Sequence, residues 1–75
     1  MTGRDSDLQT RLLAAHQAAD NAALVTLYQE AAQHAASETA EAFYLTHAYV
    51  FALEIGAPAA AEIKARLVAM GRDTP

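Results

Sequence analysis

Residues 43–55 read Phe43-Tyr44-Leu45-Thr46-His47-Ala48-Tyr49-Val50-Phe51-Ala52-Leu53-Glu54-Ile55, and this stretch decides the fold. On a helical wheel its apolar side chains cover every direction around the axis. A helix that is apolar on all sides is normally buried on all sides. The rest of this 75-residue chain is rich in alanine and covers area poorly, so we expect a second copy of the chain to cover one face.

The expected interface residues all come from this stretch: Phe43, Tyr44, His47, Val50, Phe51 and Glu54. Aromatic and apolar side chains at such a density are typical of protein contact surfaces. His47 and Glu54 lie seven residues apart and point the same way from the helix. Two such helices packed antiparallel, with a two-fold axis between Val50 and Phe51, would oppose these two side chains. The expected partner is the chain itself, as a homodimer or a higher oligomer.

Composition excludes several classes of protein. Apolar residues make up 53% of the chain and 20 residues are alanine, so the chain is neither mainly disordered nor long enough for two ordinary domains. The absence of cysteine excludes a disulfide framework, a thiolate metal site and thiol catalysis. A formal net charge of -4 argues against nucleic acid as a partner.

The N-terminus, Met1 to Asp7, is polar and acidic and lacks the pattern of a signal peptide. The most apolar stretch, residues 40–55, is shorter than the ~20 residues that a membrane-spanning helix needs. We therefore expect a cytoplasmic protein without a membrane partner. The high alanine content is compatible with a GC-rich bacterial source.

Cap and turn residues predict an all-α fold in a single domain, residues 1–75, with four short helices. The helices are expected over about 6–19, 21–36, 38–55 and 58–70, with 1–4 and 72–75 frayed. Asp5-Ser6-Asp7 and Ser37 offer N-cap oxygens, Asp20-Asn21 interrupts the first pair of helices, and Gly56 and Pro58 separate the last pair. The short connections predict two antiparallel helical hairpins.

A shift of 36 residues aligns the two halves of the chain, with Leu12 on Ala48 and Leu27 on Ile63. Two helical units at such a period are typical of helical-repeat arrays. The run 45–49, a glycine-containing turn and the run 59–63 resemble the tetratricopeptide and Sel1-like repeats, with Thr46 where those repeats have glycine. The resemblance implies a helical-hairpin scaffold that binds proteins or peptides, and it carries over no catalytic residue.

Few residues point to chemistry. Glu30 and His34, four residues apart on one helix, could contribute to a metal site, but a solvated face explains them more simply. His47 lies in an apolar stripe between Phe43 and Val50. It is either a ligand-binding or general-base group, or a histidine that is hydrogen-bonded within a core or interface, and we expect the second role.

These observations predict a small helical protein–protein interaction module that associates with itself, and with another protein or peptide, without catalytic activity. A sensor that binds a small ligand or metal through the His47 and Tyr44 region is the alternative, and an enzyme is a further one. No catalytic, cofactor-binding or metal-binding residue is assigned, and no cofactor is expected.

Overall fold

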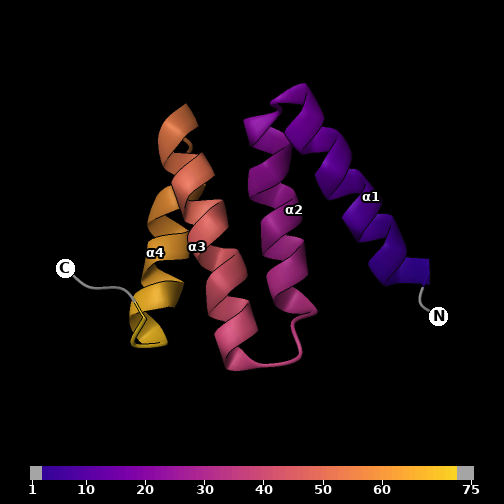
Figure 1. The fold of residues 1–75 in the computed structure, drawn as a ribbon. Coiled ribbons are helices and arrows are strands. Elements are labelled where there is room, and N and C mark those ends of the chain that lie inside the picture. Colours follow the sequence, from indigo (N-terminus) through magenta and orange to yellow (C-terminus); the bar gives the residue numbers. More distant parts are fainter. Residues whose placement is uncertain (1–2, 73–75) are drawn as a thin grey trace.

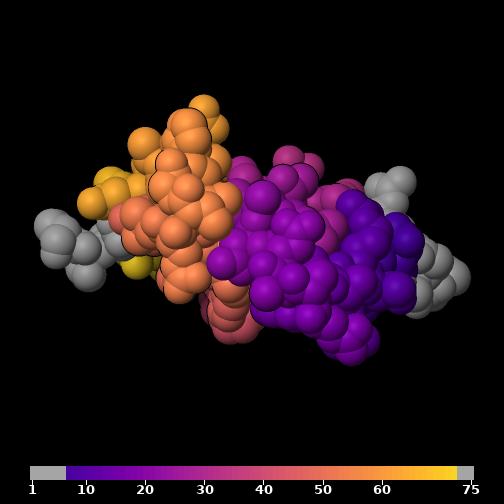
Figure 2. Space-filling view, turned by 90° about the horizontal axis from the view of Figure 1, so that it is seen from above, coloured from indigo at the N-terminus to yellow at the C-terminus, as the bar shows by residue number. Residues whose placement is uncertain are grey.

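A computed structural model describes residues 3–72, with side chains from Asp7 to Arg72. This part of the chain forms four helices: α1 (Gly3–Ala18), α2 (Asn21–Gln33), α3 (Glu38–Ile55) and α4 (Ala59–Ala69). In Figure 1 the chain rises through α1, descends through α2, rises through α3 and descends through α4. Figure 2 shows the molecule from above, with α1 (indigo) on the right, α2 (purple) in the middle and the orange part of the chain on the left. The prediction of an all-α chain with four helices is confirmed for these residues.

The starts of α2 and α3 are fixed by the predicted capping residues. The Asp20 carboxylate accepts a hydrogen bond from the Ala23 backbone N–H at 3.1 Å, and the Ser37 hydroxyl accepts one from the Ala40 N–H at 3.1 Å. Each bond satisfies a backbone donor that the first turn of a helix leaves unpaired. These local side-chain bonds explain why the starts of α2 and α3 could be predicted from sequence.

Three helices end in a residue with left-handed backbone. Gly56 after α3 has φ 65°, and the following N–H, of Ala57, bonds the Ala52 carbonyl at 2.9 Å. The same closing bond follows α4 at Gly71 and α1 at Ala19, which has φ 54° although it is not a glycine. Gly56 therefore ends α3 as predicted, and Gly71 ends α4 in the same way, whereas Ala19 adopts a conformation that strains an L-residue.

The structure corrects several expected boundaries. Helix α1 begins at Gly3 rather than at residue 6 and ends at Ala18 rather than 19. Gly3 and Arg4, which we expected to be frayed, therefore belong to it, and residues 5–7, which we expected to cap it, lie within it. The second helix ends at Gln33 rather than 36, because the chain must become extended at Ser37 to cap α3. Helix α4 is one residue shorter at each end than predicted. Residues 1–2 and 73–75 lie outside the described residues.

Two clusters of buried side chains form the core, and α2 contributes to both. One cluster joins α1 to α2 and consists of Leu8, Leu12, Ala15, Leu24, Leu27 and Ala31. The other joins α2, α3 and α4 and consists of Val25, Ala32, Ala42, Leu45, Ala48, Ala52, Ile63 and Leu67. Leu45, Ala48 and Ala52 of α3 have no exposed surface.

Within residues 3–72, backbone packing joins only consecutive helices: α1 with α2, α2 with α3, and α3 with α4. Helix α3 therefore buries the side that carries Leu45, Ala48 and Ala52, and no helix of the same chain covers its opposite side. Because α3 is apolar on all sides, the side that its own chain leaves uncovered is an exposed apolar face.

The glycine at the end of α3 and the alanine at the end of α1 predict different responses to substitution. Gly56→Ala should lower the free energy of unfolding by about 1 kcal/mol, because a Cβ at this φ is strained although no atom lies within 4 Å of it. Ala19→Gly should not destabilise, because the relief of strain offsets the larger unfolded-state entropy of glycine. Urea unfolding measures both values.

Ala14→Gly, at an exposed helical position of α1, is the control and should cost about 1 kcal/mol. If Ala19→Gly destabilised the chain as much as Ala14→Gly, then Ala19 would not be the left-handed end of α1.

Candidate functional site

The uncovered side of α3 carries a straight row of exposed residues, here called the outer row: Thr39, Phe43, Thr46, Val50 and Leu53. The three apolar members are 57%, 46% and 54% exposed at Phe43, Val50 and Leu53. Scattered apolar side chains are common on protein surfaces, whereas a contiguous row on one helix is a candidate for an interaction site. The outer row contains two of the predicted interface residues, Phe43 and Val50.

Both threonines of the outer row already have hydrogen-bond partners within the chain. The Thr46 hydroxyl donates to the Ala42 carbonyl at 2.8 Å, one turn earlier in α3. The Thr39 hydroxyl accepts a bond of 3.3 Å from the Arg72 guanidinium. A partner that buries the row would therefore leave neither hydroxyl unsatisfied, which removes the main cost of burying polar groups.

Beside the outer row lies a groove between α1 and α3, with a volume of about 350 Å³. It is lined by Gln9, Leu12, Leu13, His16, Tyr28, Phe43, Tyr44 and His47, and is here called the aromatic groove. Leu13 and Phe43, 58% and 57% exposed, stand on α1 and α3 respectively. Phe43 thus belongs both to the outer row and to the groove.

Tyr28 of α2 joins the side chains of α1 to those of α3 in this region. Its hydroxyl shares a hydrogen bond of 2.8 Å with His16 Nε2. Its ring lies 5.1 Å from the His47 ring and 6.0 Å from the Phe51 ring, centre to centre, and is stacked on Phe51. Burial raises the pKa of Tyr28, with a smaller contribution from Tyr44.

His47 has a defined tautomer when it is neutral. Its Nδ1 lies 2.9 Å from the Phe43 carbonyl oxygen. Because a carbonyl can only accept a hydrogen bond, Nδ1 carries the proton and Nε2 keeps a free lone pair. The Phe43 ring packs against the imidazole at 4.4 Å. His47 is half-buried, so its Nε2 can accept a hydrogen bond from a ligand or donate its lone pair to a metal ion.

The structure brings some of the predicted residues together and separates others. Phe43, Tyr44 and His47 line the aromatic groove, and Phe51 is half-buried against Tyr28. Val50 lies on the outer row. Glu54 lies apart from the groove, where it is exposed and accepts a bond of 3.4 Å from the Asn21 amide of α2.

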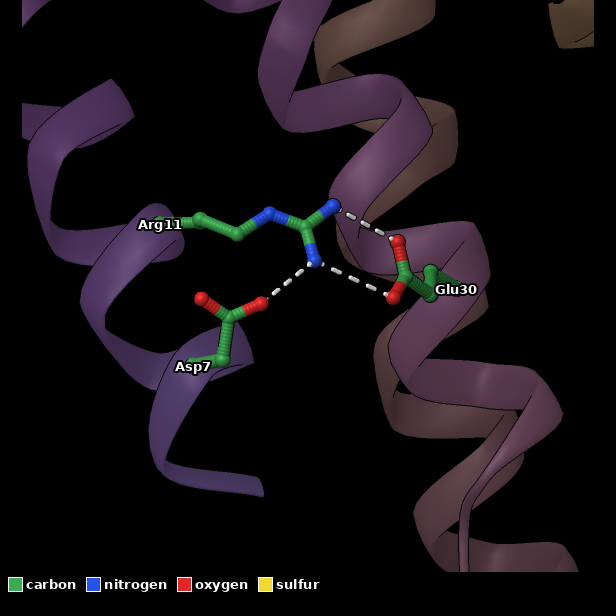
Figure 3. A network of polar contacts seen from close by, with 3 residues as sticks. All are labelled: Asp7, Arg11 and Glu30. Carbon is green, nitrogen blue, oxygen red and sulfur yellow. Dashed lines mark hydrogen bonds and ion pairs between the residues drawn. The ribbon is translucent and has the colours of Figure 1, made fainter. Parts of the chain in front are cut away.

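Glu30, considered above together with His34, pairs instead with Arg11 of α1, as Figure 3 shows. Arg11 Nη2 donates to one oxygen of Glu30 at 2.9 Å, and Nη1 donates to the other at 3.3 Å and to Asp7 at 3.2 Å. The hydrogen bonds with Glu30 and then Asp7 raise the pKa of Arg11. This network links α1 to α2 at the surface and leaves Glu30 unsuited to a metal site with His34.

Sequence reasoning missed His16 and the central position of Tyr28. On the α1 wheel His16 lies beside the buried stripe of Leu8, Leu12 and Ala15. That position was visible from the sequence as a polar residue at the edge of an apolar face. Its contact with Tyr28 was not, because it depends on how α1 is rotated against α2.

Among the described residues, no three histidine or carboxylate side chains converge as metal ligands. None of the helices over residues 3–72 combines the length and apolarity needed to cross a membrane. No protein-family model, curated protein or solved structure matches the chain. The function is therefore inferred from the outer row and the aromatic groove.

The raised pKa of Tyr28 predicts a loss of stability at high pH. The unfolded pKa is about 10 and the folded pKa is higher, so the contribution to stability is complete below pH ~10 and is lost as the pH rises through the folded value. Urea unfolding of the wild type at a series of pH values should show this decline, and Tyr28→Phe should remove part of it. An identical pH profile in Tyr28→Phe would contradict the assignment.

Proposed function

We propose that this protein is a small helical protein–protein interaction module that acts in the cytoplasm by binding a second copy of itself, without catalytic activity. The observation that carries the proposal is the outer row of α3, where Phe43, Val50 and Leu53 are each about half exposed. Both hydroxyls in the row are satisfied within the chain. Covering such a surface with another apolar surface lowers the free energy of the assembly.

The size of the molecule is compatible with such an interface. Stable protein contacts bury about 800 Å² on each partner. The chain exposes 4649 Å², so a stable dimer would cover about one-sixth of its surface. The outer row runs from Thr39 to Leu53, nearly the whole length of α3, and Leu13 extends the apolar surface across the aromatic groove onto α1.

The proposed architecture is a pair of antiparallel helical hairpins of the tetratricopeptide kind, α1 with α2 and α3 with α4. The burial of aligned positions supports it. Under the 36-residue shift, three pairs are buried in both halves: Leu12 with Ala48, Leu27 with Ile63, and Ala31 with Leu67. Equivalent burial is what two copies of one structural unit would produce. In this arrangement another protein or peptide is a second possible partner.

The aromatic groove favours a second candidate function, the binding of a small ligand. Its volume of about 350 Å³ lies within the range of small-molecule sites, and its lining combines leucine and phenylalanine side chains with polar ones, among them His47. A small planar molecule with a hydrogen-bond donor fits this chemistry. A thermal-shift panel of such molecules and of divalent metals, repeated with His47→Phe, tests the candidate, since a ligand that binds only the folded state stabilises it.

Substitution within the outer row should separate the copies without unfolding the chain. Val50→Glu places a carboxylate at a position that is 46% exposed in the single chain, so it costs little there, but burying it in a dimer costs several kcal/mol. We expect sedimentation equilibrium to show a dimer for the wild type and a folded monomer for Val50→Glu, with unchanged helical circular dichroism.

Val68→Glu is the matched control, because Val68 is 54% exposed on α4, outside the outer row. It should leave the dimer intact. A wild type that remains an 8.0 kDa monomer at high micromolar concentration would contradict the proposed function.

A further inference from the structure

We propose that the second copy packs its α3 antiparallel to the first, with Phe43 of each copy opposite Leu53 of the other and the two-fold axis at the level of Ala48. This inference rests on the proposed function, because it specifies the geometry of the same interface. The spacing of the outer row, the sizes of its side chains and the charges at its two ends support this arrangement.

The spacing of the outer row indicates that its partner is a helix. Its members, Thr39, Phe43, Thr46, Val50 and Leu53, follow one another at intervals of four, three, four and three residues. This alternation is the pattern of positions a and d in a coiled coil, which forms a narrow stripe suited to one packed helix. A second α3 carries the same stripe, so the surface is complementary to itself.

The sizes of the side chains favour the antiparallel direction. With the axis at Ala48, Thr46 lies opposite Val50 of the second copy, and Phe43 lies opposite Leu53. Threonine and valine are both β-branched and nearly equal in size, so each central layer pairs two side chains of similar shape. A parallel pair would instead stack each residue on itself, with two phenylalanines in one layer and two threonines in another.

The charges at the ends of the row also favour the antiparallel direction. Arg72 lies at the N-terminal end, bonded to Thr39, and Glu54 flanks the C-terminal end. In the antiparallel pair, Glu54 of the second copy lies within about 5 Å, along the axis, of the level of Thr39. There it lies near the N-terminal end of the other α3, where the helix dipole is positive. In its own chain it lies at the C-terminal end of α3 and accepts a bond of 3.4 Å from the Asn21 amide. A parallel pair would place two Glu54 carboxylates together.

Other acidic residues near that end do not oppose this arrangement. The Glu41 carboxylate accepts a bond of 3.4 Å from Arg66. Glu38 is adjacent to Thr39 in the sequence and therefore projects about 100° away from the row. The N-terminal end of the outer row thus keeps Arg72 as its nearest charge.

This register differs from the one expected from His47 and Glu54 alone, which placed the axis between Val50 and Phe51. With the axis at Ala48, His47 and Glu54 of the second copy lie about 7 Å apart along the axis. The antiparallel arrangement therefore does not pair them, and His47 keeps its position on the wall of the aromatic groove.

Because the chain has no cysteine, single cysteines can report the register directly. Thr46→Cys and Val50→Cys are prepared separately and oxidised either alone or as an equimolar mixture. In the antiparallel dimer, position 46 of one copy faces position 50 of the other. Equal positions are displaced by about 6 Å along the axis, which adds to the spacing between the helices and exceeds the reach of a disulfide. The mixture should crosslink at least about tenfold faster than either variant alone, and Val68→Cys should not crosslink.

The outcomes separate this inference from the proposed function. Sedimentation of both variants under reducing conditions shows first whether they dimerise, and monomers would refute the proposed function and this inference together. Dimers in which Val50→Cys alone crosslinks as fast as the mixture would overturn the antiparallel register and leave self-association standing. Dimers that crosslink in none of the samples would likewise overturn it.

Discussion

The packing of α3 between α2 and α4 is the constraint on which the rest of the structure depends. Ala42, Leu45, Ala48 and Ala52 form its buried side, and the last three have no exposed surface. Alanines at this contact bring the helix backbones close and fix the two neighbours on one side of α3. In the described chain only consecutive helices approach closely at the backbone, and the outer row of α3 stays exposed.

Three of the four buried residues of α3 are alanines, whereas the large side chains of Phe43, Val50 and Leu53 lie outside. Fully burying a valine, leucine or phenylalanine side chain stabilises by about 1.5–3 kcal/mol, whereas a methyl group contributes far less. Phe43, Val50 and Leu53 realise only part of that free energy in the single chain, since they are about half exposed. The same constraint that builds the core therefore creates the drive to cover the outer row.

The features that could be predicted from sequence are those set by local chemistry. The Ser37 and Asp20 caps and the Gly56 turn depend on a few consecutive residues, so their positions followed from residue type. Ala19 was missed because alanine carries no signal for left-handed backbone, and the closing bond from the Asp20 N–H to the Ala15 carbonyl forms only once the chain has folded back at this point.

The contacts between helices could not be predicted from the sequence, for a different reason. The bond between His16 and Tyr28 and the pairing of Arg11 with Glu30 depend on the rotation of α1 about its axis, which is set by packing. The predicted set of interface residues likewise divided between two surfaces and the end of α3. A helix that is apolar on all sides gives no direction for its exposed face until its neighbours are placed.

Phe43 connects the two surfaces that carry the functional argument. It belongs to the outer row and to the aromatic groove, and its ring packs on His47 at 4.4 Å. A second copy seated on Phe43 would restrict this ring, and a ligand in the groove would contact its other side. Two partners that share one side chain cannot bind independently, because a change in its position alters the free energy of both contacts. Linkage then requires that each partner change the affinity of the other by the same factor. Self-association and ligand binding, if both occur, are therefore coupled functions of one surface.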